Sequence, residues 1–307
     1  MGYSEKIKEA ALQLGFADCG IIPAEALTGD SARLRKWLKA GYQAGMTYME
    51  RLPDRRCNPA LLVENARSVI VVLQSYYTRN RQLDPDAPVL AKYAYGRDYH
   101  AVIKQKLRKL LELVHDITGS ATGKLFVDSS PLLEKALGRL AGLGWIGKNS
   151  LLLSRKFGSY CFIGSLIIDK ELEYDRPVRE YCGSCRLCID ACPTGAIVAS
   201  RIIDARRCIS YLTIVNKEDT IPARFHGKFR NHVFGCDICQ DICPWNQNLA
   251  PHQEPALESN GSLLSMSRDQ WHRLSESRFN DLFHGSAVNR AGYQRLMRNL
   301  RFIRENE

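Results

Sequence analysis

Cysteine placement constrains this chain more than any other feature of its sequence. Eight of the eleven cysteines in its 307 residues lie between positions 182 and 243. The first four form the pattern C-x₂-C-x₂-C-x₃-C-P and are Cys182, Cys185, Cys188 and Cys192. The other four repeat the last two spacings and the proline, with one cysteine 28 residues ahead, and are Cys208, Cys236, Cys239 and Cys243. Such closely spaced thiols are typical of metal sites, so we expect this region to fold around metal.

The spacing also indicates the kind of metal centre. Three closely spaced cysteines followed by C-P are typical of bacterial ferredoxins, in which the fourth cysteine ligates the other cluster of a pair. This crossed pattern predicts one 4Fe-4S cluster on Cys182, Cys185, Cys188 and Cys243. It predicts the second 4Fe-4S cluster on Cys192, Cys208, Cys236 and Cys239. Two zinc sites are the alternative, but zinc requires neither the third cysteine nor the two C-P pairs.

Charge and composition narrow the class of protein. The chain carries 43 Lys and Arg against 33 Asp and Glu, a formal charge of +10, which favours a polyanionic partner such as nucleic acid. With 45% apolar residues it can bury a core, and no apolar run reaches the roughly 18 residues of a membrane span. The first 30 residues lack the apolar segment of an export signal. We therefore expect a cytoplasmic protein whose thiols are not paired in disulfides, with Cys19, Cys57 and Cys161 packed in the core.

Apolar periodicity and turn residues predict a fold of the α+β class in three parts. These parts are residues 1–178, a cysteine-rich segment at 179–250, and a short helical segment at 251–307. Expected strands cover 68–75, 124–128, 150–154 and 159–169. Expected helices cover 5–14 after a Ser4 cap, 31–40, 98–115, 131–141 after Ser129, Ser130 and Pro131, 268–276 after a Ser267 cap, and 289–304. The last helix is expected to place Tyr293, Leu296, Met297, Leu300 and Ile303 on its apolar face, with Arg290, Arg295, Arg298, Arg301 and Arg304 largely on its polar side.

The run Gly142-Leu-Gly-Trp-Ile-Gly-Lys-Asn149 matches G-x-G-x-x-G and nearly matches a P-loop. Both motifs bind phosphate only where a strand precedes the glycines and a helix follows them. Here a predicted helix precedes and a predicted strand follows, so we do not expect nucleotide binding. The glycines instead indicate backbone brought close to a bulky group.

Several blocks together resemble the epoxyqueuosine reductase family. They are Phe126-Val-Asp128-Ser-Ser-Pro-Leu-Leu-Glu134, Ala141-Gly-Leu-Gly-Trp-Ile-Gly-Lys-Asn149 and the two cysteine sets. Gly96-Arg-Asp-Tyr-His100, Cys208-Ile-Ser-Tyr-Leu-Thr213 and Cys243-Pro-Trp-Asn246 extend the resemblance over about residues 1–303. It implies an oxidoreductase that uses cobalamin and two 4Fe-4S clusters to reduce epoxyqueuosine in a tRNA anticodon loop to queuosine and water. It also implies that the first domain is similar to the cobalamin-binding domain of reductive dehalogenases and that the second is ferredoxin-like.

The resemblance assigns residue roles that the sequence alone leaves open. The family's general acid corresponds to Asp128. Reductive opening of an epoxide leaves an alkoxide that needs a proton, and we expect a water-excluding corrin to raise the pKa of Asp128; helix capping is its alternative role. Besides Asp128, the expected cobalamin contacts are Lys148, Asn149, Ser150, Leu151, Ile163, Ser210 and Tyr211. The expected substrate-side residues are Arg97, Tyr99 and His100.

One departure concerns the RNA contact. Many family members continue into a C-terminal helical-repeat domain, whereas this sequence stops at Glu307. The Arg-rich last helix and the basic stretch at 201–230 are therefore the expected tRNA contacts, with 33–56 as the next candidate. We also expect a monomer and an external electron donor such as a flavodoxin or ferredoxin system. The alternatives are a cobalamin-dependent reductive dehalogenase and a two-cluster electron carrier.

Overall fold

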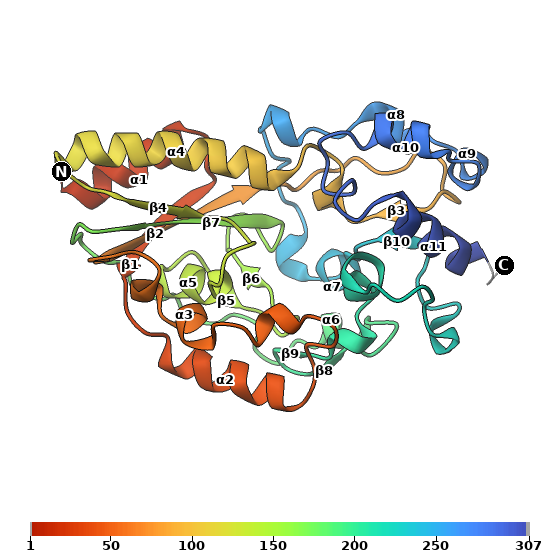
Figure 1. Cartoon of the computed structure of the whole chain (residues 1–307), viewed down its shortest axis with the longest axis horizontal. Helices are drawn as coiled ribbons and strands as arrows, with labels where there is room; N and C mark the ends of the chain where they lie inside the picture. The colour runs from red at the N-terminus through yellow and green to blue at the C-terminus, as the bar shows by residue number, and fades with distance from the viewer. Residues whose placement is uncertain (1, 305–307) are drawn as a thin grey trace.

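A computed structural model describes residues 2–304. Its main sheet has the strand order β1-β2-β7-β4, and every neighbouring pair is antiparallel (Figure 1). The strands are β1 Asp18–Pro23, β2 Ser68–Ser75, β3 Val89–Leu90, β4 Gly123–Phe126, β5 Trp145–Ile146, β6 Leu152–Leu153, β7 Cys161–Ile168, β8 Ile197–Ala199, β9 Ile202–Ile203 and β10 His232–Phe234. The helices are α1 Tyr3–Gln13, α2 Thr28–Lys39, α3 Pro53–Cys57, α4 Tyr99–Thr118, α5 Glu134–Leu140, α6 Leu187–Asp190, α7 Ile238–Asp241, α8 Gly261–Leu264, α9 Arg268–His272, α10 Glu276–Leu282 and α11 Tyr293–Arg304. An antiparallel sheet with helices packed on it confirms the expected α+β class.

The inner strand β2 is buried at all eight positions, as its apolar run at 69–73 predicts. Helices α1 and α4 cover one face of the sheet, with Ile7 and Leu107 fully buried against it. Helix α5 packs on the other face through Leu137. Helix α4 begins after Asp98, whose carboxylate accepts the His100 amide, and ends at Gly119 in the left-handed conformation. This cap places His100 in the first turn of α4, at one end of the sheet.

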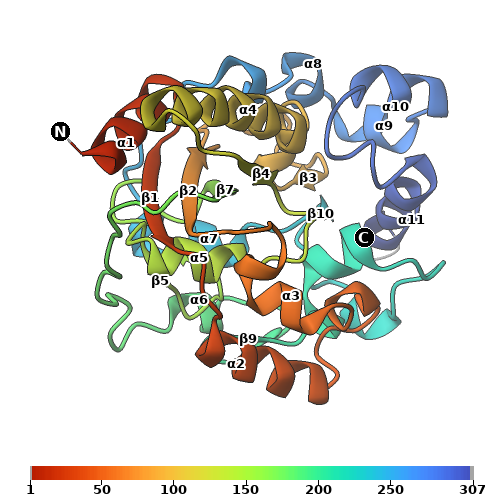
Figure 2. The ribbon, with the colours of Figure 1, turned by 60° about the vertical axis from the view of Figure 1, so that its left-hand side comes forward.

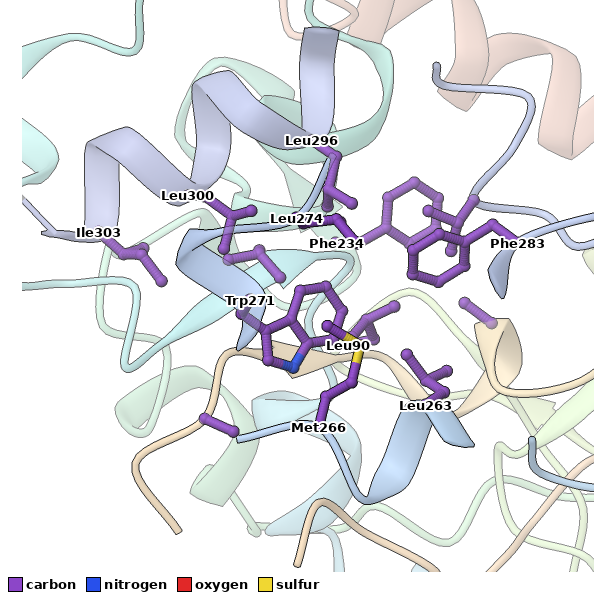
Figure 3. Packing of buried hydrophobic residues seen from close by; sticks show 14 of the residues in the cluster. Leu90, Phe234, Leu263, Met266, Trp271, Leu274, Phe283, Leu296, Leu300 and Ile303 are labelled. Atoms are coloured by element: carbon purple, nitrogen blue, oxygen red, sulfur yellow. The ribbon is translucent and has the colours of Figure 1, made fainter. Parts of the chain in front are cut away.

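A separate core joins distant parts of the chain (Figure 3). Strand β10 pairs in parallel with β3, and the helices from α8 to α11 pack around the buried indole of Trp271. Residues 87–95, 209–234 and 263–303 all contribute to this core. This core contains residues from all three expected parts of the chain. The division of the chain at residues 178 and 250 therefore stays a prediction.

Several expected boundaries are wrong for identifiable reasons. Ser4 does not cap α1; it is buried and its hydroxyl donates to the Glu173 carbonyl oxygen. Helix α5 begins at Glu134 rather than 131, because the preceding residues form a loop after β4. The expected 268–276 helix is two helices, each with its own serine cap, α9 after Ser267 and α10 after Ser275. In the described chain, no helix is both long and apolar enough to cross a membrane.

Candidate functional site

Asp128 lies two residues beyond the end of β4, on the loop that leads to α5. Its φ angle is +53°, in the left-handed region that few residues other than glycine, Asn and Asp adopt. The Asp128 amide donates a 2.6 Å hydrogen bond to Glu134 Oε1. Burial raises the pKa of the Glu134 carboxyl to about 8. Glu134 therefore holds the backbone of Asp128 in an unusual conformation, and 58% of the Asp128 side chain remains exposed.

His100 links Asp128 to a small network of charges. Its Nε2 lies 3.0 Å from Asp128 Oδ2, and its Nδ1 lies 2.6 Å from Asp98 Oδ1. Tyr99 stacks on the imidazole, with ring centroids 4.1 Å apart. Arg290, from the loop before α11, brings Nη1 within 2.6 Å of His100 Nδ1 and 3.8 Å of Asp98 Oδ2. When His100 is protonated, the positive charges of His100 and Arg290 therefore balance the negative charges of the two carboxylates.

The network shifts the pKa of both Asp128 and His100. The hydrogen bond from His100 holds the pKa of Asp128 below its usual range, although burial opposes the shift. Burial also disfavours the charged imidazole, but the hydrogen bonds to Asp128 and Asp98 outweigh it and raise the pKa of His100 above 6.5. Here the hydrogen bond from His100 sets the direction of the shift, and the expected rise in the pKa of Asp128 beside a bound corrin stays a prediction. The proton is held by the Asp128–His100 pair, and Asp128 is the member that faces the cavity.

That cavity has a volume of about 740 Å³, within the range of small-molecule sites. Its walls come from α2, the 48–56 segment, the Asp128 loop and the turn after β5. Apolar side chains dominate part of the wall, among them Leu34, Leu132 and Ile146. Two buried polar atoms of lining residues, Ser150 Oγ and Arg56 Nε, have no hydrogen-bond partner in the described chain. A large ligand with apolar and polar parts would satisfy both, so these residues fit a corrin.

The expected cobalamin contacts fall in different places. Asp128 and Ser150 line the large cavity. Tyr211 lies near it, because it is close enough to Tyr48 in the wall to act on it electrostatically. Lys148 and Asn149 line a different cavity, beside the cysteines, and their contact with cobalamin stays a prediction. Ser210, Leu151 and Ile163 are not among the residues that line either cavity.

The three expected substrate-side residues also differ in position. His100 contacts Asp128 directly. Tyr99 lies between His100 and Phe162, with its ring 4.0 Å from the Phe162 ring, and so positions the imidazole. Arg97 is exposed and forms a backbone bridge with Ser286, which ties the start of α4 to the C-terminal segment.

The first predicted thiol set surrounds the second cavity, of about 300 Å³. Cys182, Cys185, Cys188 and Cys243 all line it. The indole N–H of Trp145 donates to Cys182 Sγ at 3.4 Å. Lys148 Nζ donates to the carbonyl oxygens of Gly183 and Cys185, which fixes the cysteine loop.

The second predicted set also converges. Cys239 lies close enough to Cys192, Cys208 and Cys236 for all three to act on it electrostatically. The Ala196 amide donates to Cys192 Sγ at 3.2 Å, the kind of N–H contact that tunes cluster potentials. Over residues 2–304, no three His, Cys, Asp or Glu side chains are close enough to hold one metal ion. Which cysteines hold which cluster stays a prediction.

Sequence reasoning missed several residues of the site. Arg290 was assigned only to the polar side of the last helix, yet it reaches His100 across 190 positions of sequence. Arg56 and Tyr48 line the large cavity without belonging to any motif. Glu134 was quoted in a motif, but only the structure shows its hydrogen bond to Asp128. The spacing of residues along one helix does not predict contacts between residues that are far apart in the sequence.

The expected RNA contact on the last helix is wrong for its central residue. Arg298 is 7% exposed, and its guanidinium donates to the carbonyl oxygens of Leu212, Asn216 and Glu218. Arg295 likewise donates to the Ile214 carbonyl oxygen. These arginines anchor the π-helix η5 (Tyr211–Val215), which follows Cys208, and Arg298 is not available to bind phosphate.

Comparison with known proteins places the chain in a family. Residues 181–246 match a family model described as "4Fe-4S double cluster binding domain", and residues 56–129 match "Epoxyqueuosine reductase QueG, DUF1730". An epoxyqueuosine reductase of Cellulophaga algicola is 47% identical over 98% of both chains. The chain belongs to the epoxyqueuosine reductase family. A second epoxyqueuosine reductase, from Pseudomonas aeruginosa, is 42% identical over 97% of this chain and 83% of its own length.

Solved epoxyqueuosine reductases share the fold. The enzyme from Streptococcus thermophilus has a TM-score of 0.89 at 28% identity, covering 98% of this chain and 80% of that one. Another, crystallised with an epoxyqueuosine-modified tRNA-Tyr stem loop, has a TM-score of 0.89 at 29% identity, covering 96% and 79%. A reductive dehalogenase matches at a TM-score of only 0.43 and 17% identity, too weak to relate the two folds.

Proposed function

We propose that this protein reduces the epoxide of epoxyqueuosine in a tRNA anticodon loop, in the cytoplasm. The reaction consumes two electrons and two protons, removes the epoxide oxygen as water, and leaves the alkene of queuosine. The observation that carries the proposal is the Asp128–His100 pair on the wall of a 740 Å³ cavity, in a chain of this family. Opening an epoxide develops negative charge on oxygen, and a positioned acid at that wall meets this need.

The chain's residues suggest where each cofactor would be held. The large cavity, with Ser150 and Arg56 offering unpaired polar atoms, would hold cobalamin. The two thiol sets would hold the 4Fe-4S clusters. When bound, these groups supply electrons at low potential. The first domain and the ferredoxin-like segment would therefore act together, as one electron path ending at the large cavity.

The protein's own contribution is to position and deliver a proton. Glu134 fixes the Asp128 backbone, and Tyr99 with Asp98 fixes the His100 ring. Because the pair shares a proton across a 3.0 Å contact, the proton that rests on His100 can pass to Asp128 and from there to the oxygen leaving the epoxide. Arg290 keeps the network close to neutral as the proton moves.

The anticodon loop would approach at the exposed rim of the large cavity. Arg51 and Arg290 are exposed there, and Tyr48, at 49% exposure, offers a ring on which a base can stack. The target nucleoside lies in a loop and would be turned out of its stack into the cavity. On this proposal, the RNA contact lies on the 48–56 segment rather than on α11.

The test is a reaction of the anaerobically reconstituted enzyme with an epoxyqueuosine-containing stem loop and reduced methyl viologen. Nucleosides released from the RNA are separated and weighed by mass spectrometry. We expect a product lighter by one oxygen atom only when both cofactors are loaded. An enzyme carrying both cofactors that leaves the epoxide intact would contradict the proposal.

A further inference from the structure

The loop that carries the first thiol set is exposed and surrounded by cations. Cys185 is exposed, whereas Cys182 and Cys188 are half-buried and Cys243 is buried. Next to it, Leu187 and Ile242 expose 44% and 39% of their surface at the adjoining ends of α6 and α7. We call this region the cysteine-loop surface; it consists of Lys148, Arg155, Arg179, Cys185, Arg186, Leu187 and Ile242. It shares no residue with the wall of the large cavity.

The charge on this surface is unbalanced. Arg155 and Arg179 both lie over the ring of Tyr181, at 5.1 and 4.9 Å from its centroid, so one aromatic ring gathers two positive charges. Neither guanidinium has an ion-pair partner within residues 2–304. The nearby acids Glu180 and Asp190 are already paired, with Arg201 and Arg186. Two like charges held side by side favour an anionic partner.

We propose that the cysteine-loop surface is the docking site of an acidic one-electron carrier protein. A small apolar centre with a charged rim is suited to a brief encounter that is steered by charge. An RNA partner fits less well, since the centre is apolar and no residue of the surface reaches the large cavity. This inference deepens the proposed function and rests on it, because it names the partner that supplies the electrons.

The electron balance sets how the surface is used. A reduced carrier gives up one electron at each encounter and leaves oxidised by one electron. Two encounters supply the two electrons that one epoxide consumes, while the protons come from solvent through the Asp128–His100 pair. Fast dissociation is therefore as important as binding, and a weak, salt-sensitive complex is expected.

The experiment measures the affinity of a bacterial flavodoxin for the reconstituted enzyme by calorimetry, at low and high salt. The variant R155E/R179E should weaken binding by roughly 10- to 100-fold at low salt and flatten the salt dependence. The matched control is R108E/K109E, which reverses two exposed cations on α4, on the opposite side of the sheet from α6 (Figure 2). This control should bind flavodoxin as the wild type does.

Two further measurements separate the possible outcomes. Turnover with reduced methyl viologen should not change in R155E/R179E, because this small cation needs no docking site. If the wild type itself fails in this assay, the result counts against the proposed function and not against the docking site. Iron content checks that the variant is intact, and R155Q/R179Q replaces it if iron is lost. Equal flavodoxin affinity in R155E/R179E and in R108E/K109E would overturn the proposal. Loss of stem-loop binding in R155E/R179E with unchanged flavodoxin affinity would also overturn it, and would assign the surface to RNA.

Discussion

Replacing Asp128 with Asn should nearly abolish epoxide reduction without disturbing the fold. Asn is among the few residues that accept the left-handed φ of +53°. Its side chain keeps the size of Asp, and the backbone amide of residue 128 keeps its hydrogen bond to Glu134. What it removes is the ionisable oxygen 3.0 Å from His100 Nε2. The change therefore isolates proton delivery from backbone geometry.

The expected magnitude follows from that loss. A positioned acid contributes about 10²–10⁴ in rate, or about 2.7–5.5 kcal/mol in the activation barrier. The D128N variant also removes one of the two carboxylates that raise the pKa of His100, so the imidazole should titrate at lower pH. The matched control is Asp98→Asn, which keeps the helix cap because Asn caps as well as Asp. D98N should mainly shift the pH dependence, since Asp98 does not line the large cavity.

The assay is single turnover of loaded enzyme with excess reduced methyl viologen and stem loop, followed by nucleoside mass spectrometry. Iron content and the visible spectrum report on cofactor loading, and the His100 ring can be followed by NMR. Wild-type turnover by D128N would refute the assignment and leave Asp128 as a structural residue. Equal losses in D128N and D98N would instead show that only the charge on His100 matters.

Four further outcomes follow from the structure. The rate should fall as pH rises through the raised pKa of His100, above 6.5, because the pair then loses its proton; a rate independent of pH in this range would contradict this role. The ion pairs of His100 should stabilise the fold fully below pH 6.5, down to the acid range in which Asp128 titrates. This stabilisation should disappear as the pH rises through the raised pKa of His100. The measurement compares the unfolding free energies of the wild type and His100→Gln across this pH range. Arg298→Met should lower the free energy of unfolding by about 3 kcal/mol, because the buried carbonyl oxygens of Leu212 and Asn216, and the partly buried one of Glu218, lose their donor. Arg301 is exposed, so Arg301→Gln should change this free energy by less than about 0.5 kcal/mol; equal effects would contradict the anchoring role. Anaerobically purified protein should contain about eight iron and eight sulfide per chain, and Cys208→Ala about half of each; stoichiometric zinc would exclude the clusters.

Local patterns predicted those parts of the molecule that depend on neighbours in sequence. The spacing of the cysteines predicted two groups of four, and the structure brings the same two groups together. The apolar run at 69–73 lies in the inner strand β2. Helical periodicity correctly placed Leu296 and Leu300 on the buried side of α11, but it also assigned Arg298 to solvent. Periodicity cannot foresee that a π-helix presents unpaired carbonyl oxygens on that side.

The site itself depends on contacts that no local pattern encodes. Asp128 was found through a resemblance, and its lowered pKa follows from His100, 28 positions away. Arg290 reaches the same imidazole from beyond the cysteine region. The charge on a carboxyl group is set by what lies around it in space, so no local pattern shows that His100 lowers the pKa of Asp128.

The core around Trp271 has a consequence for how the chain folds during synthesis. Its early part, residues 87–95, leaves the ribosome long before residues 263–303, which complete the core. Tyr95 and Leu90 therefore stay without their buried neighbours until residues 263–303 have been made. Such waiting segments invite aggregation or chaperone binding. We expect that a nascent chain arrested before α11 binds chaperones, and that this binding ends once α11 has been made and can pack.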